Sequence, residues 1–367
     1  MKILGIESSC DETAAAIVEN GKYLLSNVVN SQIDIHAQYG GVIPEIAARS
    51  HIEAINPVVN QALSDANLTW SDIDAIAVTY APGLLGSLLV GSLAARTLAI
   101  TKNKPLYPIH HVEAHVYSNF LVKSQNTTNQ KISGTNAKLP NVQPKFPILA
   151  LIVSGGHTQI VLFKDHGKYS LIGQTRDDAV GEAFDKVAKI LGLPYPGGPS
   201  ISKIAQQGNP KKYILPVSRM ENPYDFSFSG LKTAVLRKVQ QEVGVDISYP
   251  SFKLSEKLTP EMQADFASSF QYTAVKTLVQ KIIKAYNEYH PQSVVIAGGV
   301  AANQELRKQL AEQLPVEINY TPIELCTDNA AMIATLGYYQ AQKTDPVDPY
   351  SLEIEPSLSM TNTSWSN

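Results

Sequence analysis

The chain has 367 residues, of which 44% are hydrophobic and 17% are charged, a composition typical of a globular protein large enough for two cores. Thirty Lys and Arg residues against 33 Asp and Glu residues give a net charge of -3, which excludes a strongly basic nucleic-acid-binding chain. If RNA is a substrate, a local basic patch or a partner protein must attract it. Cys10 and Cys326 fit no disulfide framework or thiolate metal motif, as is typical of the reducing cytoplasm.

The chain starts directly with strand-like residues 3–6, so we expect no secretory or transit peptide ahead of them. The best apolar stretch, residues 84–100, is interrupted by Gly86, Gly91 and Arg96. A membrane span needs about 18 apolar residues in a row. We therefore expect a cytoplasmic protein with no membrane partner.

The two halves of the chain repeat one pattern. Residues 3–18 and 148–163 each predict a strand, a small polar turn and a second strand. Residues 73–83 and 293–299 each predict a buried strand that leads into a glycine turn and a helix. Free N–H groups at such helix starts favour an anion, so these turns facing one cleft predict a nucleotide site.

Two other nucleotide-binding architectures fit less well. A Rossmann domain predicts G-x-G-x-x-G directly after the first strand, whereas residues 7–12 contain no glycine and include Asp11 and Glu12. A Walker-type phosphate loop is absent from the sequence. Acidic side chains in the first turn favour a site that holds a cation or water near phosphates, although strand–glycine–helix junctions also occur without any ligand.

The sharpest local signal is the pair His111 and His115. Four residues apart, they share one face of a helix, a spacing that suits two imidazoles on one metal. A zinc protease would need Glu directly after the first histidine, but Val112 stands there and Glu113 points away from that face. Because a pair of histidines is also a common surface or capping feature, a third ligand is needed.

Asp328 is the best candidate for that ligand, since a polar turn there precedes a small-residue helix. The plain alternative is that Asp328 caps this helix. Two histidines and one aspartate with open positions suit iron or zinc acting as a Lewis acid on a phosphate or carbonyl.

Further segments predict pocket walls. Residues 154–158 form a glycine turn between two strands, which either approaches a ligand closely or is a plain hairpin. Residues 177–186 gather carboxylates whose repulsion needs a cation, ribose hydroxyls or Lys186. Residues 194–199 predict a stiff loop, and residues 225–233 fit a core segment, a ligand platform or an RNA contact.

Two polar segments carry few large apolar side chains. Residues 121–146 predict a flexible insertion, and residues 344–367 predict a disordered tail. We therefore expect a first lobe over 1–120, completed by a helix at 329–343, and a second lobe over 147–328.

Together the motifs resemble the universal tRNA threonylcarbamoyladenosine transferase family, formerly misnamed glycoproteases. The matching segments run in order through nearly the whole chain: 5–13, 40–45, 81–84, 110–115, 153–158, 181–186, 195–199, 226–232, 298–303 and 326–329. Ala301 stands where serine is usual, and the insertion is longer than in many relatives.

The resemblance implies a duplicated α/β fold of the actin/Hsp70/sugar-kinase type (ASKHA), with two lobes and an interlobe cleft. It implies transfer of a threonylcarbamoyl group from threonylcarbamoyl-AMP, made by a separate synthase, to N6 of adenosine 37 in tRNAs that read codons beginning with A. The implied partners are tRNA, an inactive TsaB-like paralogue and a TsaE-like P-loop ATPase.

The resemblance also implies roles for individual residues. The metal ligands would be His111, His115 and Asp328, holding one divalent ion, iron(II) first and zinc second. The adenylate would contact Ile152, Val153, Ser154, Gly155, Gly156, Asp185, Gly198 and Asn303, while Asp11 and Glu12 would orient groups or handle a proton at the phosphate end.

Two alternatives use the same fold. A non-catalytic nucleotide-binding scaffold should lack the histidine pair and the distal aspartate, which this chain has. A small-molecule kinase should phosphorylate a sugar or an acid in the presence of ATP.

Overall fold

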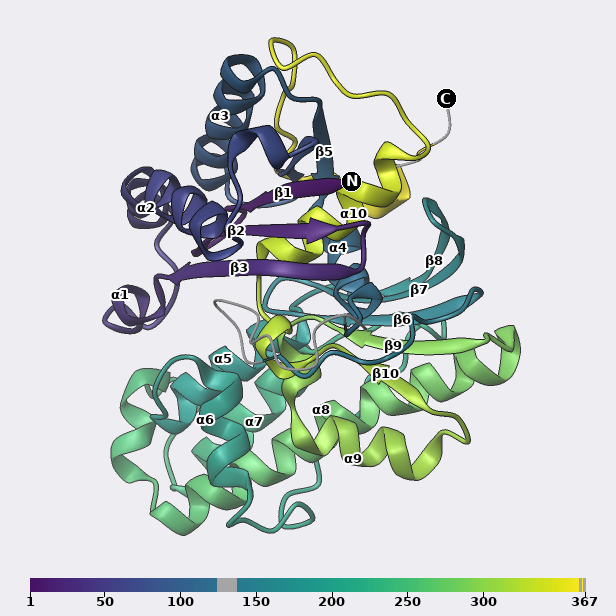
Figure 1. Ribbon diagram of the computed structural model, residues 1–367. Coiled ribbons are helices and arrows are strands. Elements are labelled where there is room, and N and C mark those ends of the chain that lie inside the picture. The colour runs from purple at the N-terminus through teal and green to yellow at the C-terminus, as the bar shows by residue number, and fades with distance from the viewer. Residues whose placement is uncertain (124–136, 363–364, 366–367) are drawn as a thin grey trace.

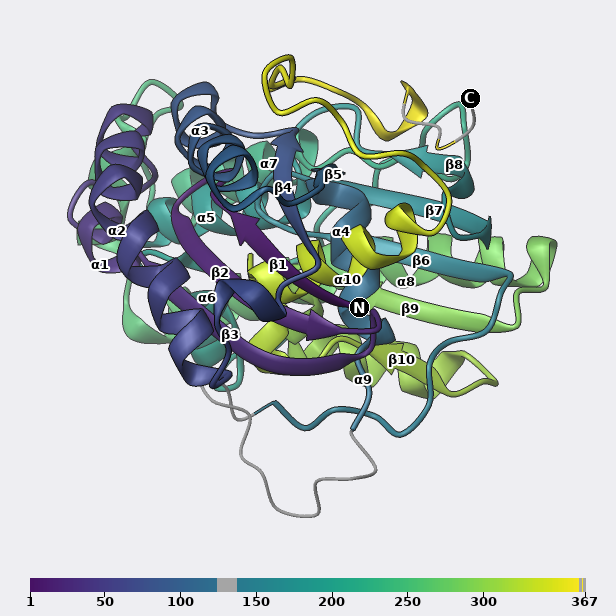
Figure 2. The ribbon, with the colours of Figure 1, turned by 45° about the horizontal axis from the view of Figure 1, so that its top comes forward.

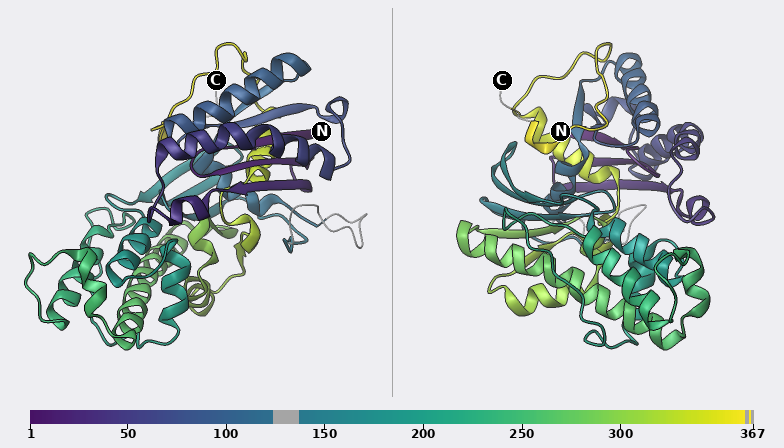
Figure 3. Two further views of the ribbon diagram at one scale, coloured as in Figure 1. Left: turned by 90° about the vertical axis from the view of Figure 1, so that its left-hand side faces the viewer. Right: turned by 180° about the vertical axis from the view of Figure 1, so that it is seen from behind.

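The computed structural model describes residues 1–123, 137–362 and 365. Most of the predicted insertion, residues 124–136, and four residues of the tail, 363, 364, 366 and 367, lie outside the described residues. Figures 1 and 3 show two lobes, each built on one sheet, with helices on their outer sides.

The first sheet has five strands in the order β3-β2-β1-β4-β5. The strands are β1 (Lys2–Glu7), β2 (Glu12–Glu19), β3 (Tyr23–Ser31), β4 (Ala75–Ala81) and β5 (Leu106–His110). Strand β1 pairs antiparallel with β2 and parallel with β4. Its residues 3–7 are fully buried, as expected for the central strand of a sheet covered on both faces.

The second sheet repeats this arrangement in the order β10-β9-β6-β7-β8. The strands are β6 (Ile148–Val153), β7 (Thr158–Asp165), β8 (Lys168–Gln174), β9 (Ser293–Ala297) and β10 (Ile318–Tyr320). Strand β6 pairs antiparallel with β7 and parallel with β9, as β1 does with β2 and β4. The predicted duplication is therefore confirmed.

The helices form three layers around the two sheets. Helices α2 (Pro44–Asp65) and α3 (Leu85–Lys102) cover the outer face of the first sheet, and the short α1 (Ile33–Ala37) follows β3. The outer face of the second sheet carries α5 (Val180–Leu191), α6 (Gly197–Ala205), α7 (Ser229–Glu242), α8 (Pro260–Tyr289) and α9 (Gln304–Gln313). Between the sheets lie α4 (His111–Tyr117) and α10 (Ala330–Ala341), whose apolar side chains share one core with both sheets.

None of the helices in the described part of the chain is long and apolar enough to cross a membrane.

The segment after α10 differs from the disordered tail that the sequence predicts. Over the described residues 344–362 the backbone is held by the first lobe: Val347 bridges to Leu106 of β5, and the Arg96 guanidinium on α3 donates to the carbonyl of Pro349. The short helix 360–362 then reaches β8 (Figure 2). Backbone carbonyls of this tail accept hydrogen bonds from the first lobe, and the polar composition alone does not reveal these bonds.

The described ends of the insertion are also attached to the lobes. Val122 donates its N–H to the carbonyl of Lys22, and the Gln143 amide donates to the carbonyl of Phe120. We propose the division into a first lobe of residues 1–120 with α10 and a second lobe of residues 147–328.

Candidate functional site

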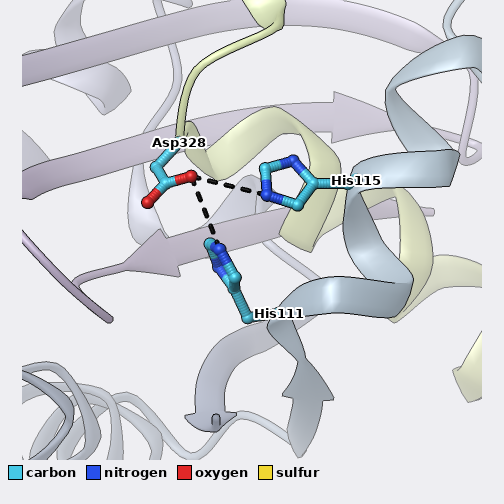
Figure 4. Close-up of side chains that lie close together, drawn as sticks. All are labelled: His111, His115 and Asp328. Carbon is cyan, nitrogen blue, oxygen red and sulfur yellow. Dashed lines mark ion pairs between the residues drawn. The ribbon is translucent and has the colours of Figure 1, made fainter. Parts of the chain in front are cut away.

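Two imidazoles and one carboxylate meet between the sheets. Strand β5 ends at His110, whose side chain accepts a hydrogen bond from the Glu113 N–H and so starts α4 at His111. The Nε2 atoms of His111 and His115 lie 3.4 Å and 3.5 Å from Oδ1 of Asp328 (Figure 4). One donor atom from each residue lies within 4.8 Å of the other two, so the group could hold a metal ion.

Asp328 is not the cap of the final helix. Asn329 takes that position, because its side chain accepts a hydrogen bond from the N–H of Met332. The capping alternative for Asp328 is therefore wrong, and its carboxylate is turned towards the two histidines.

The chemistry of the three side chains fits a divalent cation. Nε2 of His115 is buried and makes no hydrogen bond within the described residues. Burial, helped by the positive charge of His111, lowers the pKa of His115 to about 4. Burial alone would raise the pKa of Asp328, but the charge and hydrogen bond of His111 lower it. A neutral imidazole with a free lone pair and an ionised carboxylate are the forms that bind metals.

The sequence did not single out Glu7, which supports His111 from behind. Its Oε2 lies 3.0 Å from Nδ1 of His111 and accepts the Thr79 hydroxyl, while Oε1 accepts the N–H of Ser9. An N–H donated from Nδ1 to Glu7 orients the ring so that Nε2 of His111 points towards Asp328. A carboxylate directly after the apolar run of residues 3–6 is the sequence signal that could have revealed this role.

Of the predicted acidic residues, Asp11 ends the turn between β1 and β2, and Glu12 is the first residue of β2. Ser31 donates its hydroxyl to Glu12, and Gln32 donates its N–H to the carbonyl of Asp11. Burial raises the pKa of Glu12 well above its usual value, and the negative charges of Asp328 and Asp11 add to this effect. Glu12 therefore lies close enough to the histidine–aspartate group to feel its charge.

His51 on α2 fixes the same turn. Its Nε2 lies 3.0 Å from the carbonyl of Cys10 and its Nδ1 lies 2.8 Å from the Thr13 hydroxyl. Nε2 can only donate to a carbonyl, and in the neutral ring Nδ1 then accepts from the Thr13 hydroxyl. Burial, the largest influence, lowers the pKa of His51 accordingly.

The glycine turn after β6 leaves open space. An added Cβ at Gly155, Gly156 or Gly198 would meet nothing within 4 Å, whereas one at Gly181 would lie 2.5 Å from the carbonyl of Ser154. The start of α5 therefore packs against one side of the glycine turn, while the side at Gly155 and Gly156 is open. The side chains of Ile152 and Val153 are fully buried, so only their backbone could face a ligand.

Of the predicted adenylate contacts, Asp185 lies on α5 and Gly198 lies in the first turn of α6. Asp185 accepts the N–H of Gly197 at 2.7 Å, and burial, the largest influence, raises its pKa, to which the charge of Asp11 contributes. Asn303 is differently engaged: it caps α9 and donates its amide to Ser202 and Gln271 within the second lobe.

The other predicted pocket segments are structural in large part. Lys186 compensates the clustered carboxylates, at 2.9 Å from Asp178 and 2.7 Å from Glu182, and Lys232 lies 2.8 Å from Asp178. Phe226 and Phe228 are fully buried, so the aromatic residues of segment 225–233 belong to the core.

Comparison with known proteins agrees with this architecture. A sequence model of the family described as tRNA N6-adenosine threonylcarbamoyltransferase (TsaD) matches residues 23–335. A protein of that name from Thermomicrobium roseum is 49% identical over 94% of this chain and 93% of its own length. Another from Dehalococcoides mccartyi is 46% identical over 99% of this chain and 100% of its own length.

A solved structure, that of full-length HypF in a phosphate- and nucleotide-bound form, covers 93% of this chain with 46% of its own and a TM-score of 0.54. At 12% identity this likeness concerns the fold alone, and it agrees with the predicted ASKHA architecture. The resemblance inferred from the motifs is confirmed by the sequence matches. The chain belongs to the tRNA N6-adenosine threonylcarbamoyltransferase family.

Proposed function

We propose that this chain transfers a threonylcarbamoyl group from threonylcarbamoyl-AMP to N6 of adenosine 37 in tRNAs that read codons beginning with A. The product is N6-threonylcarbamoyladenosine. The observation that carries this proposal is the convergence of His111, His115 and Asp328 in a chain of this family. A non-catalytic scaffold would have no need of such a group.

The reaction needs no covalent enzyme intermediate. The adenosine N6 attacks the carbonyl carbon of the mixed anhydride, a C–N bond forms, and the bond from that carbon to the phosphate oxygen breaks. AMP leaves with the electron pair, and N6 loses one proton. The acyl carbon is already activated, so positioning and stabilisation of the leaving anion suffice.

His111, His115 and Asp328 would hold the divalent ion, iron(II) in the first place and zinc in the second. When bound, such an ion supplies a Lewis acid beside the phosphate and the carbonyl. The support lies in this chain: a buried imidazole nitrogen without a hydrogen bond in the described structure, a carboxylate with a lowered pKa, and Glu7 behind His111.

The adenylate would lie along the turn after β6. The open space at Gly155, Gly156 and Gly198 gives the ligand room to approach the backbone. The phosphate would be flanked by the backbone of Ile152, Val153 and Ser154 and by the Ser154 hydroxyl. Asp185 would contact the ribose hydroxyls. Asn303, which caps α9, would help to shape the part of the site that holds the adenine base.

Asp11 and Glu12 would orient the reacting groups or take the proton released from N6. Their support is their place in the turn held by His51, and the charge that Asp328 exerts on Glu12. A carboxylate whose pKa is raised accepts protons more readily near neutral pH.

A slightly acidic chain needs help to hold tRNA. We propose that a TsaB-like paralogue and a TsaE-like P-loop ATPase assist it in the cytoplasm. The surface of α3 supports the proposal of a protein partner. Leu85, Leu89 and Leu93 recur every four residues on its outer face and are 64%, 45% and 48% exposed.

Mass spectrometry of tRNA nucleosides from cells depleted of this protein tests the proposal. Loss of N6-threonylcarbamoyladenosine, restored by the wild-type chain but not by Asp328→Asn, is the expected result. Unchanged levels after depletion would contradict it.

A further inference from the structure

A cavity lies beside the histidine–aspartate group. Its volume is about 270 Å3, many times the room that one water molecule needs. Residues from both lobes and from the tail form its walls, among them Pro82, His110, His157, Gln159, Gln174 and Met360. None of the proposed metal or adenylate ligands lines it within the described residues.

The cavity adjoins the reaction centre through two of its walls. His110 directly precedes His111, and His157 directly follows the glycine turn proposed for the adenylate. The cavity also reaches the molecular surface, since Ser357 of its tail wall is exposed. A group bound there would therefore lie next to the donor and could enter from outside.

Two amide side chains are placed side by side at this cavity. Gln159 of β7 and Gln174 of β8 are direct partners in the antiparallel pair, so their side chains project from the same face of the sheet. Gln159 is only 8% exposed, and its Oε1 is buried with no hydrogen-bond partner among the described residues. A buried amide oxygen without a partner is costly, and a ligand that donates a hydrogen bond to it would offset that cost.

The charge of the lining restricts what that ligand is. Among the described residues that form the walls, none is Asp, Glu, Lys or Arg. The threonine carboxylate and the phosphate of the donor are anions and would find no cationic side chain here. The acceptor base is uncharged and planar, with polar edges and apolar faces that suit amides beside Pro82 and Met360.

We propose that this cavity receives the acceptor adenine of tRNA, turned out of its stack, and that Gln159 reads its N6 edge. Enzymes that modify a base commonly take it into such a pocket, where polar side chains contact its edge and apolar ones its faces. Glutamine pairs with adenine by accepting from the N6 amine and donating to a ring nitrogen. One N6–H would donate a hydrogen bond to Gln159, which leaves the nitrogen lone pair available to the carbonyl carbon.

This inference rests on the proposed function, and kinetics can separate the two. The purified chain, with its partner proteins, is assayed with threonylcarbamoyl-AMP and tRNA that lacks the modification. Gln159→Met keeps the length of the side chain and removes the amide. We expect a rise of about tenfold in the KM for tRNA, an unchanged KM for the adenylate and unchanged metal content. The exposed Gln313→Met on α9 is the matched control.

Binding to two anticodon stem-loops tests base recognition without turnover. One carries adenosine and the other purine riboside, which lacks the N6 amine, at the modified position. The wild type should bind the adenosine loop several-fold more tightly, and Gln159→Met should bind both equally. If Gln159→Met does not fold, as judged by its thermal unfolding, Gln174→Met takes its place.

The inference would be overturned if both glutamine variants kept the wild-type KM for tRNA and the wild-type preference for the adenosine loop. A rise confined to the KM for the adenylate would also overturn it and would assign the cavity to the donor. Absence of any transfer by the wild type would instead refute the proposed function.

Discussion

The carboxylate of Glu7 lies 3.0 Å from Nδ1 of His111, and both side chains are almost completely buried. The pair joins the central strand β1 to the start of α4, two elements 104 residues apart in sequence. Burial opposes the charged form of each group, but for His111 the negative charges of Asp328 and Glu7 prevail and raise its pKa well above the usual value. Glu7 therefore sets the orientation of the imidazole that we propose as a metal ligand.

Replacing Glu7 by Gln should weaken metal binding by about 10- to 100-fold, because support behind a metal-binding histidine has effects of this size. It should also lower the free energy of unfolding by about 1–3 kcal/mol, since an amide cannot accept from Ser9, Thr79 and His111 together. Metal titration followed by inductively coupled plasma mass spectrometry, and chemical denaturation, measure the two effects. Wild-type metal affinity in a folded Glu7→Gln protein would contradict this role.

His111→Ala and Asp328→Asn should each give a folded protein with little bound metal and transfer activity reduced by at least about 100-fold. Circular dichroism checks folding and metal analysis checks content. Asp34→Asn, at an exposed position on α1, is the control for the change of charge. Full metal content in both variants would refute the ligand assignment.

Asp185→Asn should raise the KM for threonylcarbamoyl-AMP by about tenfold, the effect of losing one charged hydrogen bond to a ribose hydroxyl. The amide oxygen of Asn can still accept the N–H of Gly197, so the loop should keep its shape. Metal content should not change. An unaltered KM, with the exposed Asp246→Asn as reference, would exclude Asp185 from the adenylate site.

Leu89→Asp combined with Leu93→Asp should weaken association with a TsaB-like paralogue by at least tenfold, because both charges fall in the centre of the exposed face of α3. Stability should change little at exposed sites. Ile214→Asp, at a position 96% exposed on the second lobe, serves as the control. Equal affinity of the double variant and the wild type, by calorimetry, would place the partner elsewhere.

Stability should fall in mild acid partly because of His166. Burial, followed by the charge of Lys343, lowers its pKa to about 4. The pKa of histidine in the unfolded chain is about 6.5. At a pH between that value and the folded pKa, the unfolded chain binds a proton at His166 that the folded protein does not. The free energy of unfolding should therefore decrease with falling pH by at most about 1.4 kcal/mol per unit. Denaturation of His166→Phe between pH 7 and pH 4, chosen to span this window, should give a shallower slope, and an identical slope would exclude His166.

The sequence allowed the duplicated fold and the shared helix face of His111 and His115 to be predicted, because both depend on local patterns. The strand–turn–strand repeats are continuous apolar runs, buried along most of β1, β2, β6 and β7. The spacing of His111 and His115 is fixed by the helix. Asp328 could be proposed but not separated from a capping role, since only the structure shows Asn329 as the cap.

Other features depend on contacts between distant segments. Glu7 is ordinary in sequence and gains its role only where β1 meets α4. The tail composition indicates disorder, yet carbonyls of residues 349 and 358 are bound by Arg96 and His110. Gln159 and Gln174 become neighbours only through the register of β7 and β8.

Reconstituted transfer tests the central claim most directly. Purified protein, threonylcarbamoyl-AMP and unmodified tRNA are combined with the partner proteins, and the nucleosides are measured by mass spectrometry. The account predicts N6-threonylcarbamoyladenosine at position 37 with metal-loaded wild type and almost none with Asp328→Asn, which should still fold. Equal product from a metal-free Asp328→Asn protein would contradict it.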